Sequence, residues 1–389
     1  MKILMLEWDS FGQEYIRQEF INAGCQIEIL EWPFGAENMR GNEELCNTLK
    51  QKIRESNSDF VFSLNFFPVA AKGCYECGVK YVSWIYDTPY LLLYSKHIKY
   101  DTNIVLLFDK SLYLEFRKQE LNNVFYFPMA APVDVYDEIK AENGEKYVSD
   151  VSFVGSTYQE SRQDFYQLIE NASPFVKGYL DAVINMQKEV YGSFFLDKVL
   201  NKQILEELRR VCPIPKEEDE WESDEWLYAN YFLARKLTGL QRVEILQLLS
   251  EDYRLKVYAP EEVDVLDEAC KEGPVDYINE MPLVFKNSKI NLNMTLRSIQ
   301  SGIPLRAMDI MGCGGFLLTN YQADFEDYFE AGVDYVYYTD NEDLLIKVAY
   351  YLEHEEERKQ IARNGYEKVK ANHTYRHRIQ SILEMVKEG

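Results

Sequence analysis

Short runs of hydrophobic residues recur along the first third of the chain, and segments with helical spacing separate them. The first run ends at Leu6 and the second at Leu30, and a turn with Gly12 and a helical pattern lie between them. A strand, a glycine turn, a helix and a strand in this order predict a βαβ unit, the start of a parallel sheet. Further hydrophobic runs follow at 60–64, 81–85, 104–108 and 124–127. We therefore expect one α/β domain over residues 1–135.

A polar stretch separates this part of the chain from a second one. The second part begins with a strand pattern at 150–154, and apolar residues at helical spacing follow from about 160 to 250. Strand patterns return at 255–258, 290–293 and 315–319, and helical patterns end the chain at 340–352 and 355–386. We expect a second α/β domain over 148–389, with a helical insertion at about 160–250 and C-terminal helices over 355–386.

The length of 389 residues exceeds what one hydrophobic core usually supports, so it favours two domains. Two successive α/β halves predict two Rossmann-like domains that face one another across a cleft. Sheets of this kind bind their ligands at the carboxyl ends of the strands. The residues that follow the predicted strands are therefore the candidates for chemistry.

The net charge of the chain limits the classes of partner that it is expected to bind. Acidic residues outnumber basic ones by 65 to 42, which gives a formal net charge of -23. A field of this sign repels phosphate backbones and anionic lipids, so nucleic acid and membrane surfaces are not expected partners. The N-terminal run is too short and acidic for a signal peptide, and no apolar segment is long enough to be transmembrane. Seven irregularly spaced cysteines are typical of reduced thiols. We expect a cytoplasmic protein, whose oligomeric state the pattern does not define.

The segment 290–320 carries the strongest chemical signal. It predicts a strand, a Gly/Pro loop, a short helix that begins near Pro304, a Gly-Gly turn and another strand. Arg306 and Asp309 then lie close to a helix N-terminus, where free N–H groups and the helix dipole favour an anion. Arg306 can form two hydrogen bonds to phosphate, and Asp309 can accept ribose hydroxyls, so the pair suits a nucleoside diphosphate. The alternative is an Arg–Asp pair on the surface of an amphipathic helix.

Glycine turns follow two other predicted strands. At Gly155-Ser156 the backbone N–H groups can approach a diphosphate, because glycine permits close contact; an ordinary strand-to-helix turn is the alternative. Ser10 and Gly12 occupy the first turn of the chain. We place them on the acceptor side, with a helix cap as the alternative.

Asp87 follows the predicted strand 81–85 and precedes Pro89. It is a candidate general base for an acceptor hydroxyl, or a cap for a helix that begins near Pro89. Trp84 and Tyr86 are candidates for stacking on a sugar. We place these two side chains on opposite faces of the strand, so that at most one of them faces the cleft.

Two short motifs look like halves of a metal site. Cys74 and Cys77 form one, and His373 and His377 form the other. The two halves lie far apart in the sequence and no second cysteine pair accompanies them, so we expect no metal.

Several motifs occur in a fixed order along the second half. Asn293 lies in a strand, Arg306 and Asp309 follow, Gly314-Gly315 form a turn, and an apolar strand ends in Thr319-Asn320. Other elements of the same pattern are 84–89, 151–156, 350–358, 361–365 and 373–378. Through these motifs nearly the whole chain resembles the spore maturation CgeB-like glycosyltransferases, which are related to glycosyltransferase family 4.

The resemblance implies the GT-B fold and a metal-independent reaction without a cofactor, in which a nucleotide-sugar is the co-substrate. It also implies that the C-terminal domain binds the donor and the N-terminal domain the acceptor. The expected nucleotide-sugar contacts are Gly155, Ser156, Asn293, Arg297, Arg306, Asp309, Gly314 and Gly315. The expected acceptor side holds Ser10, Gly12, Trp84 and Tyr86. Catalysis is assigned to Asp87 as base and to Arg306, with Arg297 second, as the cation at the leaving diphosphate.

One position departs from the pattern of family 4. Two glutamates of that pattern correspond here to Ser301 and Asp309, so the first acid near the transferred sugar is replaced. Retention of configuration is expected from the resemblance, without an assigned nucleophile.

The sequence thus predicts a glycosyltransferase that moves a sugar from a nucleotide-sugar to a hydroxyl of a glycan, a glycoprotein or a surface polymer. A non-catalytic nucleotide-sugar-binding protein is the main alternative, because Ser301 removes an acid. A sugar-nucleotide epimerase or hydrolase of the same fold is a third interpretation. The nucleotide, the sugar and the acceptor are not defined by the sequence.

Overall fold

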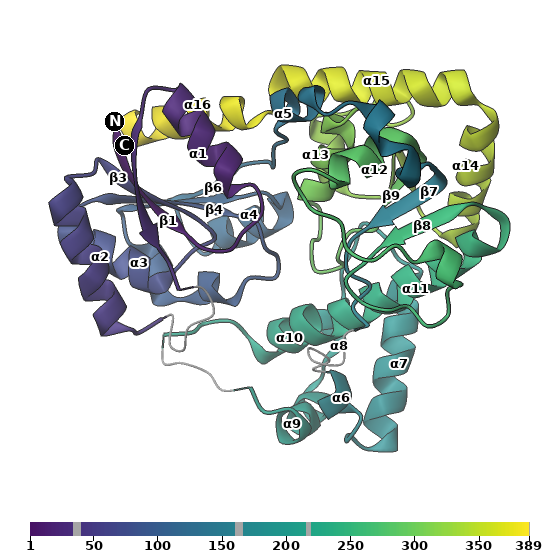
Figure 1. Cartoon of the computed structure of the whole chain (residues 1–389). Helices are drawn as coiled ribbons and strands as arrows, with labels where there is room; N and C mark the ends of the chain where they lie inside the picture. Colours follow the sequence, from purple (N-terminus) through teal and green to yellow (C-terminus); the bar gives the residue numbers. More distant parts are fainter. Residues whose placement is uncertain (34–39, 160–165, 215–218, 389) are drawn as a thin grey trace. The chain divides into compact units, whose positions relative to one another are not determined.

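A computed structural model of the chain describes residues 1–33, 40–159, 166–214 and 219–388 (Figure 1). Contacts between residues divide the chain into two compact units. The first unit consists of Met1–Ala130, Lys216–Glu222 and Asn372–Gly389, and the second of Ala131–Pro215 and Ser223–Ala371.

The first unit is built on a parallel six-stranded sheet with the order β2-β1-β3-β4-β5-β6. Its strands are β1 (Lys2–Glu7), β2 (Gln26–Glu31), β3 (Phe60–Leu64), β4 (Lys80–Ile85), β5 (Asn103–Leu107) and β6 (Val124–Tyr126). Every residue of β3 and β5 is buried, as is usual for central strands covered by helices on both faces. The strand order reverses between β1 and β3, so the turns after these two strands meet at the carboxyl edge.

Helices cover both faces of this sheet (Figure 1). They are α1 (Gln13–Asn22), α2 (Glu43–Ser56), α3 (Pro68–Cys77), α4 (Lys110–Lys118) and α16 (Tyr375–Glu388), with 3-10 turns at Leu91–Tyr94 and Lys96–Lys99. Helix α16 packs beside α1, and the rings of Tyr15 and Tyr375 stack at 6.2 Å. Arg378 also fastens α16 to the unit, because its guanidinium donates to the carbonyl oxygens of Pro128 (2.8 Å) and Met129 (3.2 Å).

The second unit is built on a parallel five-stranded sheet with the order β11-β10-β9-β7-β8. Its strands are β7 (Ser149–Val154), β8 (Leu255–Tyr258), β9 (Ser288–Asn293), β10 (Leu317–Asn320) and β11 (Val336–Tyr338). Here the order reverses between β7 and β9. The core beneath this sheet includes Val151, Ile290 and Leu318, all fully buried.

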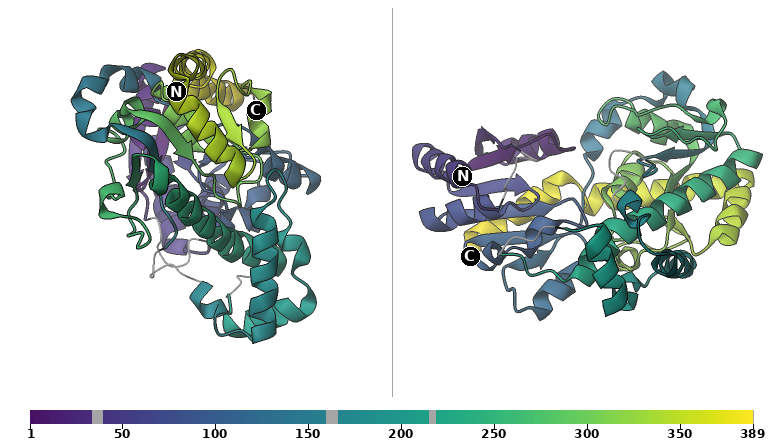
Figure 2. Two further views of the ribbon diagram at one scale, coloured as in Figure 1. Left: turned by 90° about the vertical axis from the view of Figure 1, so that its right-hand side faces the viewer. Right: turned by 90° about the horizontal axis from the view of Figure 1, so that it is seen from below.

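The helices of the second unit form two groups. One group packs around this sheet, and the other is inserted in the sequence between β7 and β8. The former are α5 (Val133–Glu138), α12 (Met281–Asn287), α13 (Leu305–Gly312), α14 (Asn341–Glu353) and α15 (Glu355–Asn372), with 3-10 turns at Ala141–Tyr147, Glu268–Cys270 and Ala323–Asp327. Between β7 and β8 stand α6 (Tyr166–Ile169), α7 (Pro174–Lys188), α8 (Leu196–Val199), α9 (Lys202–Val211), α10 (Asp224–Leu227), a π-helical turn at Tyr228–Leu233, and α11 (Ala234–Asp252). These insertion helices enclose a hydrophobic core of their own and gather at one end of the unit (Figure 2).

The predicted α/β class with two parallel sheets is confirmed. The helical insertion is present from α6 to α11, and the expected start at 160–165 lies outside the described residues. No helix in the described ranges is both long and apolar enough to cross a membrane.

The C-terminal helices differ from the expectation. The pattern over 355–386 predicts one helix inside the second domain, but α15 ends at Asn372 and α16 belongs to the first unit. A second short segment also groups with the first unit. Glu220 pairs with Arg40 at 3.1 Å, and the Trp221 ring lies 4.9 Å from that of Tyr94. A helical period shows that one face is buried, but it does not say against which partner.

Candidate functional site

In the second unit, the turns after β7 and β9 are adjacent because these strands pair at the point where the strand order reverses. Ligands of open parallel sheets bind at such points. Gly155 and Ser156 follow β7, and Met294 and Thr295 follow β9. The predicted Gly-Ser turn therefore lies where a ligand site is expected.

A carboxylate holds the turn after β7. Gly155 has φ +155°, a conformation that a side chain would strain. The Ser156 hydroxyl and the Thr157 N–H (2.9 Å) both donate to the Glu261 carboxylate, which comes from the loop after β8. The turn that was expected to meet a diphosphate through its backbone N–H groups thus already binds an anionic group of the chain, through the Ser156 hydroxyl and the next N–H.

Arg242, which sequence analysis did not single out, joins the ends of the two strands. It lies on α11 and is 8% exposed. Its Nη1 donates to the Ser156 carbonyl oxygen at 2.5 Å, and its Nε donates to the Met294 carbonyl oxygen at 3.1 Å. The guanidinium also covers the Tyr158 ring at 4.9 Å. In the sequence, Arg242 is visible only as a basic residue within a helical pattern. Its partners, Ser156 and Met294, lie more than 50 residues away along the chain.

Asn293 and its neighbours join the ends of β9 and β10. The Asn293 amide donates to the hydroxyls of Thr295 (3.0 Å) and Thr319 (2.8 Å). The Asn320 Oδ1 accepts from the Thr295 backbone N–H at 2.7 Å. Asn293 is therefore buried at the predicted edge of the sheet, and its amide is used for holding the loop.

Arg297 lies in the loop after β9 and is 8% exposed. Its Nη2 donates to the carbonyl oxygens of Gln187 (2.9 Å) and Val190, and its guanidinium stands 4.2 Å from the Tyr191 ring. Its Nη1 is buried and has no hydrogen-bond partner among the residues that the structure describes. A cavity of about 20 Å³, room for one water molecule, lies beside Arg297. Arg297 therefore keeps one donor that the loop contacts do not use.

Arg306 and Asp309 form a pair at the start of α13, as predicted, but they differ in access. The Arg306 side chain is 28% exposed, and its Nη1 is 3.8 Å from Asp309 Oδ2. Asp309 is fully buried, and its carboxylate accepts from the hydroxyls of Tyr136 (2.9 Å) and Tyr277 (3.2 Å). Burial raises the Asp309 pKa to about 6, against the opposing effects of Arg306 and the two tyrosines. This geometry offers Arg306 to a ligand, but it does not offer the Asp309 carboxylate to a ribose.

Gly314 and Gly315 lie elsewhere. They join the end of α13 to the start of β10, which is the amino edge of the sheet. A Cβ on Gly315 would come within 2.6 Å of the Asn291 amide and 2.9 Å of the Phe285 carbonyl oxygen. The turn thus serves close packing between helix and strand, away from the carboxyl-edge residues.

In the first unit, Asn65 and Asp87 form a compact arrangement after β3 and β4. The Asn65 Oδ1 accepts from the backbone N–H groups of Tyr86 (2.9 Å) and Asp87 (3.2 Å), and its amide donates to Asp87 Oδ2 at 2.6 Å. Asn65 itself is fully buried, with φ +60°. Asn65 was not among the predicted site residues, although an Asn directly after a hydrophobic run is visible in the sequence.

Asp87 has an exposed surface but also a carboxyl group whose pKa is raised by burial. The residue is exposed, yet burial of its carboxyl raises its pKa, while the bond from Asn65 lowers it. The exposed surface is the more direct measure of what a substrate can reach. An accessible carboxylate with a raised pKa suits a general base.

Trp84 and Tyr86 lie on one face, so the expectation of opposite faces is wrong. Residues two apart on a strand point the same way, and the two rings meet edge to face at 5.2 Å. Trp84 is fully buried, and its place is therefore the core. The Tyr86 hydroxyl donates to that of Tyr375 at 3.0 Å.

The first βα turn is closed by contacts within the unit. The Ser10 hydroxyl donates to Gln13 Oε1 at 2.7 Å. Gly12 has φ +81°, and a Cβ there would lie 2.8 Å from the Tyr375 hydroxyl. Glycine is therefore required where α16 crosses the start of α1. Elsewhere among the described residues, no three His, Cys, Asp or Glu side chains are grouped so that they could hold a metal ion.

Two Rossmann-like units with parallel sheets that both reverse their order at the first strand define the GT-B class of fold. Within this chain, residues 240–384 match the family model described as Glycosyl transferase-like. The matched segment, more than a third of the chain, includes Arg242, Asn293, Arg297, Arg306 and Asp309. No curated protein matches the sequence.

Several solved structures are similar over the whole chain. Sucrose-phosphate synthase from Thermosynechococcus elongatus has a TM-score of 0.57 and 9% identity, over 100% of this chain and 98% of that one. Anabaena HepE in complex with UDP and glucose has a TM-score of 0.55 and 12% identity, over 100% of both chains. A glycosyltransferase from Rickettsia africae ESF-5 has a TM-score of 0.52 and 10% identity, over 100% and 98%. At these identities the likeness establishes the fold.

Proposed function

We propose that the chain is a glycosyltransferase that moves a sugar from a nucleotide-sugar to a hydroxyl of a carbohydrate or glycoprotein acceptor. The observation that carries this proposal is the overlap between the Glycosyl transferase-like match and the carboxyl-edge residues of the second unit, Arg242 to Arg306. HepE, which shares the fold, has been crystallised with UDP-glucose, so UDP-sugars are the first donors to test.

The donor is assigned to the second unit. Its leaving diphosphate needs a cation, and Arg306 presents an accessible guanidinium at the start of α13. Arg297 offers its unpaired Nη1 as a second donor. The turn after β7 is the third group assigned to the diphosphate. It can bind the diphosphate when the Glu261 carboxylate moves away from the Ser156 and Thr157 donors.

The acceptor is assigned to the first unit. In the transfer step, the bond from the sugar C1 to the diphosphate oxygen breaks and a bond from C1 to the acceptor oxygen forms. The proton of the acceptor hydroxyl passes to the Asp87 carboxylate, which Asn65 orients. We propose that the reaction needs no metal or cofactor and takes place in the cytoplasm, on the resemblance to CgeB-like enzymes. Retention is proposed on the same resemblance, and it requires the acceptor oxygen to reach C1 from the face that the diphosphate leaves.

A thermal-shift screen with UDP, GDP, ADP and CMP and their common sugar conjugates tests the donor site first. A rise in melting temperature with one series identifies the nucleotide. Release of that nucleotide is then measured with and without candidate acceptors, in buffer with EDTA. Release that needs an acceptor and survives EDTA supports the proposed transfer, and NMR of the product's anomeric proton tests retention.

A non-catalytic nucleotide-sugar-binding protein is the second candidate, and Ser301 at the position of an acid favours it. Tight binding without turnover on any acceptor would support this candidate. No shift with any nucleotide at millimolar concentration would contradict both proposals.

Arg306→Ala tests the assigned cation. Loss of a charge-assisted contact to the diphosphate is worth about 2–3 kcal/mol, so donor affinity should fall about 30- to 150-fold. Arg363→Ala, an exposed change on α15, is the matched control and should bind as the parent does. Unchanged donor binding in a folded Arg306→Ala variant would remove this residue from the site.

A further inference from the structure

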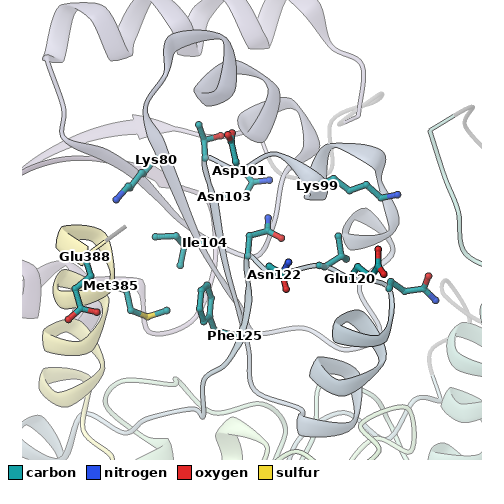
Figure 3. Close-up of a pocket in the computed structure, with 14 residues that line it drawn as sticks. Lys80, Lys99, Asp101, Asn103, Ile104, Glu120, Asn122, Phe125, Met385 and Glu388 are labelled. Carbon is teal, nitrogen blue, oxygen red and sulfur yellow. The ribbon is translucent and has the colours of Figure 1, made fainter.

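An open cavity of about 760 Å³ lies in the first unit, at the amino ends of β4, β5 and β6 (Figure 3). Lys80, Asn103 and Asn123 mark the starts of these strands, and Met385 and Glu388 of α16 line one side. The cavity is thus at the opposite edge of the sheet from Asp87, about 15–20 Å away along strands of five to six residues. It is separate from the site described above, and its volume is typical of small-molecule sites.

The lining combines an apolar patch with a rim of amides. Ile104, Phe125 and Met385 come together on one side in Figure 3, and the Phe125 residue is 37% exposed. Gln119, Asn122 and Asn123 belong to the segment that leads into β6. The Asn123 NH2 group donates to the carbonyl oxygens of Ile98 (2.6 Å) and Tyr100 (3.1 Å). The Gln119 and Asn122 amides offer both a donor and an acceptor, as neighbouring hydroxyls of a sugar ring require. An exposed aromatic ring beside such groups suits the apolar C–H face of a pyranose.

Polar atoms under the cavity wall support a ligand rich in hydroxyls. Thr102 Oγ1 and Asn103 Oδ1 are buried, and within the described part of the chain neither has a hydrogen-bond partner. Asn103 is 2% exposed, and its NH2 group donates to the carbonyl oxygens of His97 (2.8 Å) and Ile98 (3.2 Å). These bonds fix the amide, so its oxygen is an acceptor in need of a donor.

The charges argue against a phosphorylated ligand. Asp101, Glu120 and Glu388 line the cavity with Lys80 and Lys99. The Lys80 ammonium also donates to the Val386 carbonyl oxygen at 2.7 Å. Three carboxylates against two lysines do not concentrate anions, and a nucleotide-sugar would not be favoured here.

We propose that this cavity binds a neutral saccharide, at a carbohydrate site distinct from the carboxyl-edge site. The proposal does not depend on turnover, because the lining residues belong to neither the donor nor the acceptor assignments. A bound glycan here would be held by stacking on Phe125 and by hydrogen bonds to the amides of the rim.

Binding is tested with the purified full chain, by isothermal titration and saturation-transfer NMR. The probes are maltotetraose, cellotetraose and tetra-N-acetylchitotetraose, without nucleotide. At least one should bind at millimolar concentration or below. Phe125→Ala should weaken that binding about tenfold or more, and Asn122→Ala should weaken it several-fold. Phe175→Ala, an exposed phenylalanine of α7 in the other unit, is the control and should change nothing.

Asn122 is exposed and Phe125 is partly exposed, so both variants should fold, and their melting temperatures check this. Absence of binding by all three probes would overturn the proposal. Binding that persists unchanged in both folded variants would equally overturn it, because the saccharide would then lie elsewhere. Neither outcome bears on the donor site, whose test uses nucleotides.

Discussion

Asp309→Asn separates a buried structural carboxylate from a ligand-binding one. Asp309 is fully buried, and its pKa rises from 3.8 to about 6 because burial disfavours the charged form. A rise of this size is worth about 3 kcal/mol. Asparagine resembles the protonated acid in shape and charge, and its oxygen can still accept from the Tyr136 hydroxyl. The variant should therefore escape the cost of the buried charge.

The sign of the effect depends on pH. Between pH 3.8 and about 6 the folded chain holds a proton on Asp309 that the unfolded chain has lost, so parent stability falls as pH rises through this window. At pH 8 the full cost is present, and Asp309→Asn should be more stable than the parent by about 3 kcal/mol. At pH 5 the same linkage leaves about half of that difference.

Scanning calorimetry at pH 5, 6, 7 and 8 measures the difference. For a unit of this size, about 3 kcal/mol corresponds to roughly 6–12 °C in melting temperature. Asp181→Asn, an exposed change on α7, should show no pH-dependent gain. A variant less stable than the parent at pH 8, or a gap that does not shrink toward pH 5, would refute the reasoning. Nucleotide affinity should stay unchanged, and a large loss would restore Asp309 to the ribose.

Two further predictions concern the loop contacts. Asn65→Gly keeps the positive φ but removes the amide that donates to Asp87, so the Asp87 pKa should rise. The acidic limb of the pH–rate profile should then move to higher pH. An unmoved limb in an active, folded variant would contradict Asp87 as the base. Glu261→Gln removes the charge that competes for the Ser156 and Thr157 donors. In a calorimetric titration, UDP should therefore bind about fivefold more tightly, a gain of about 1 kcal/mol. Weaker binding would mean that Glu261 orders the loop for the ligand.

Hydrophobic runs predicted the strands well because nearly every residue of a central parallel strand is buried. The runs at 60–64 and 104–108 correspond closely to β3 and β5. Helices were predicted as elements, but their partners were not. The pattern over 355–386 contains a break at His373 and Thr374. Contacts such as the stacking of Tyr375 on Tyr15 show that the last helix packs on the first unit, and the sequence pattern does not reveal them.

The candidate site shows the same division. Spacing put Arg306 and Asp309 three residues apart on one short helix, but spacing cannot say which of them is buried. Most of α13 is buried, including Asp309, and Tyr136 and Tyr277 supply its donors from distant segments. Arg242 and Glu261 were missed because their partner, Ser156, lies more than 80 residues away in sequence.

The loops at the carboxyl edges of both sheets are held by the same kind of hydrogen bond. A polar side chain from one segment satisfies the backbone of the loop after a neighbouring strand: Asn65 holds the residues after β4, Asn320 holds Thr295, and Arg242 holds the turns after β7 and β9. Groups used in this way fix the loops before a ligand arrives, which lowers the entropic cost of binding. They are also no longer free to contact it.

Ligand contacts must then come from groups that the loops leave unused. In the second unit these include the Arg297 Nη1, which no described residue contacts by a hydrogen bond, and the accessible Arg306 guanidinium. Both are cations in a chain of formal charge -23, and both belong to the carboxyl side of the sheet. A local positive site against a negative background selects a small anion while it still repels large polyanions. A nucleoside diphosphate meets that requirement, and this is the physical reason to expect the donor there.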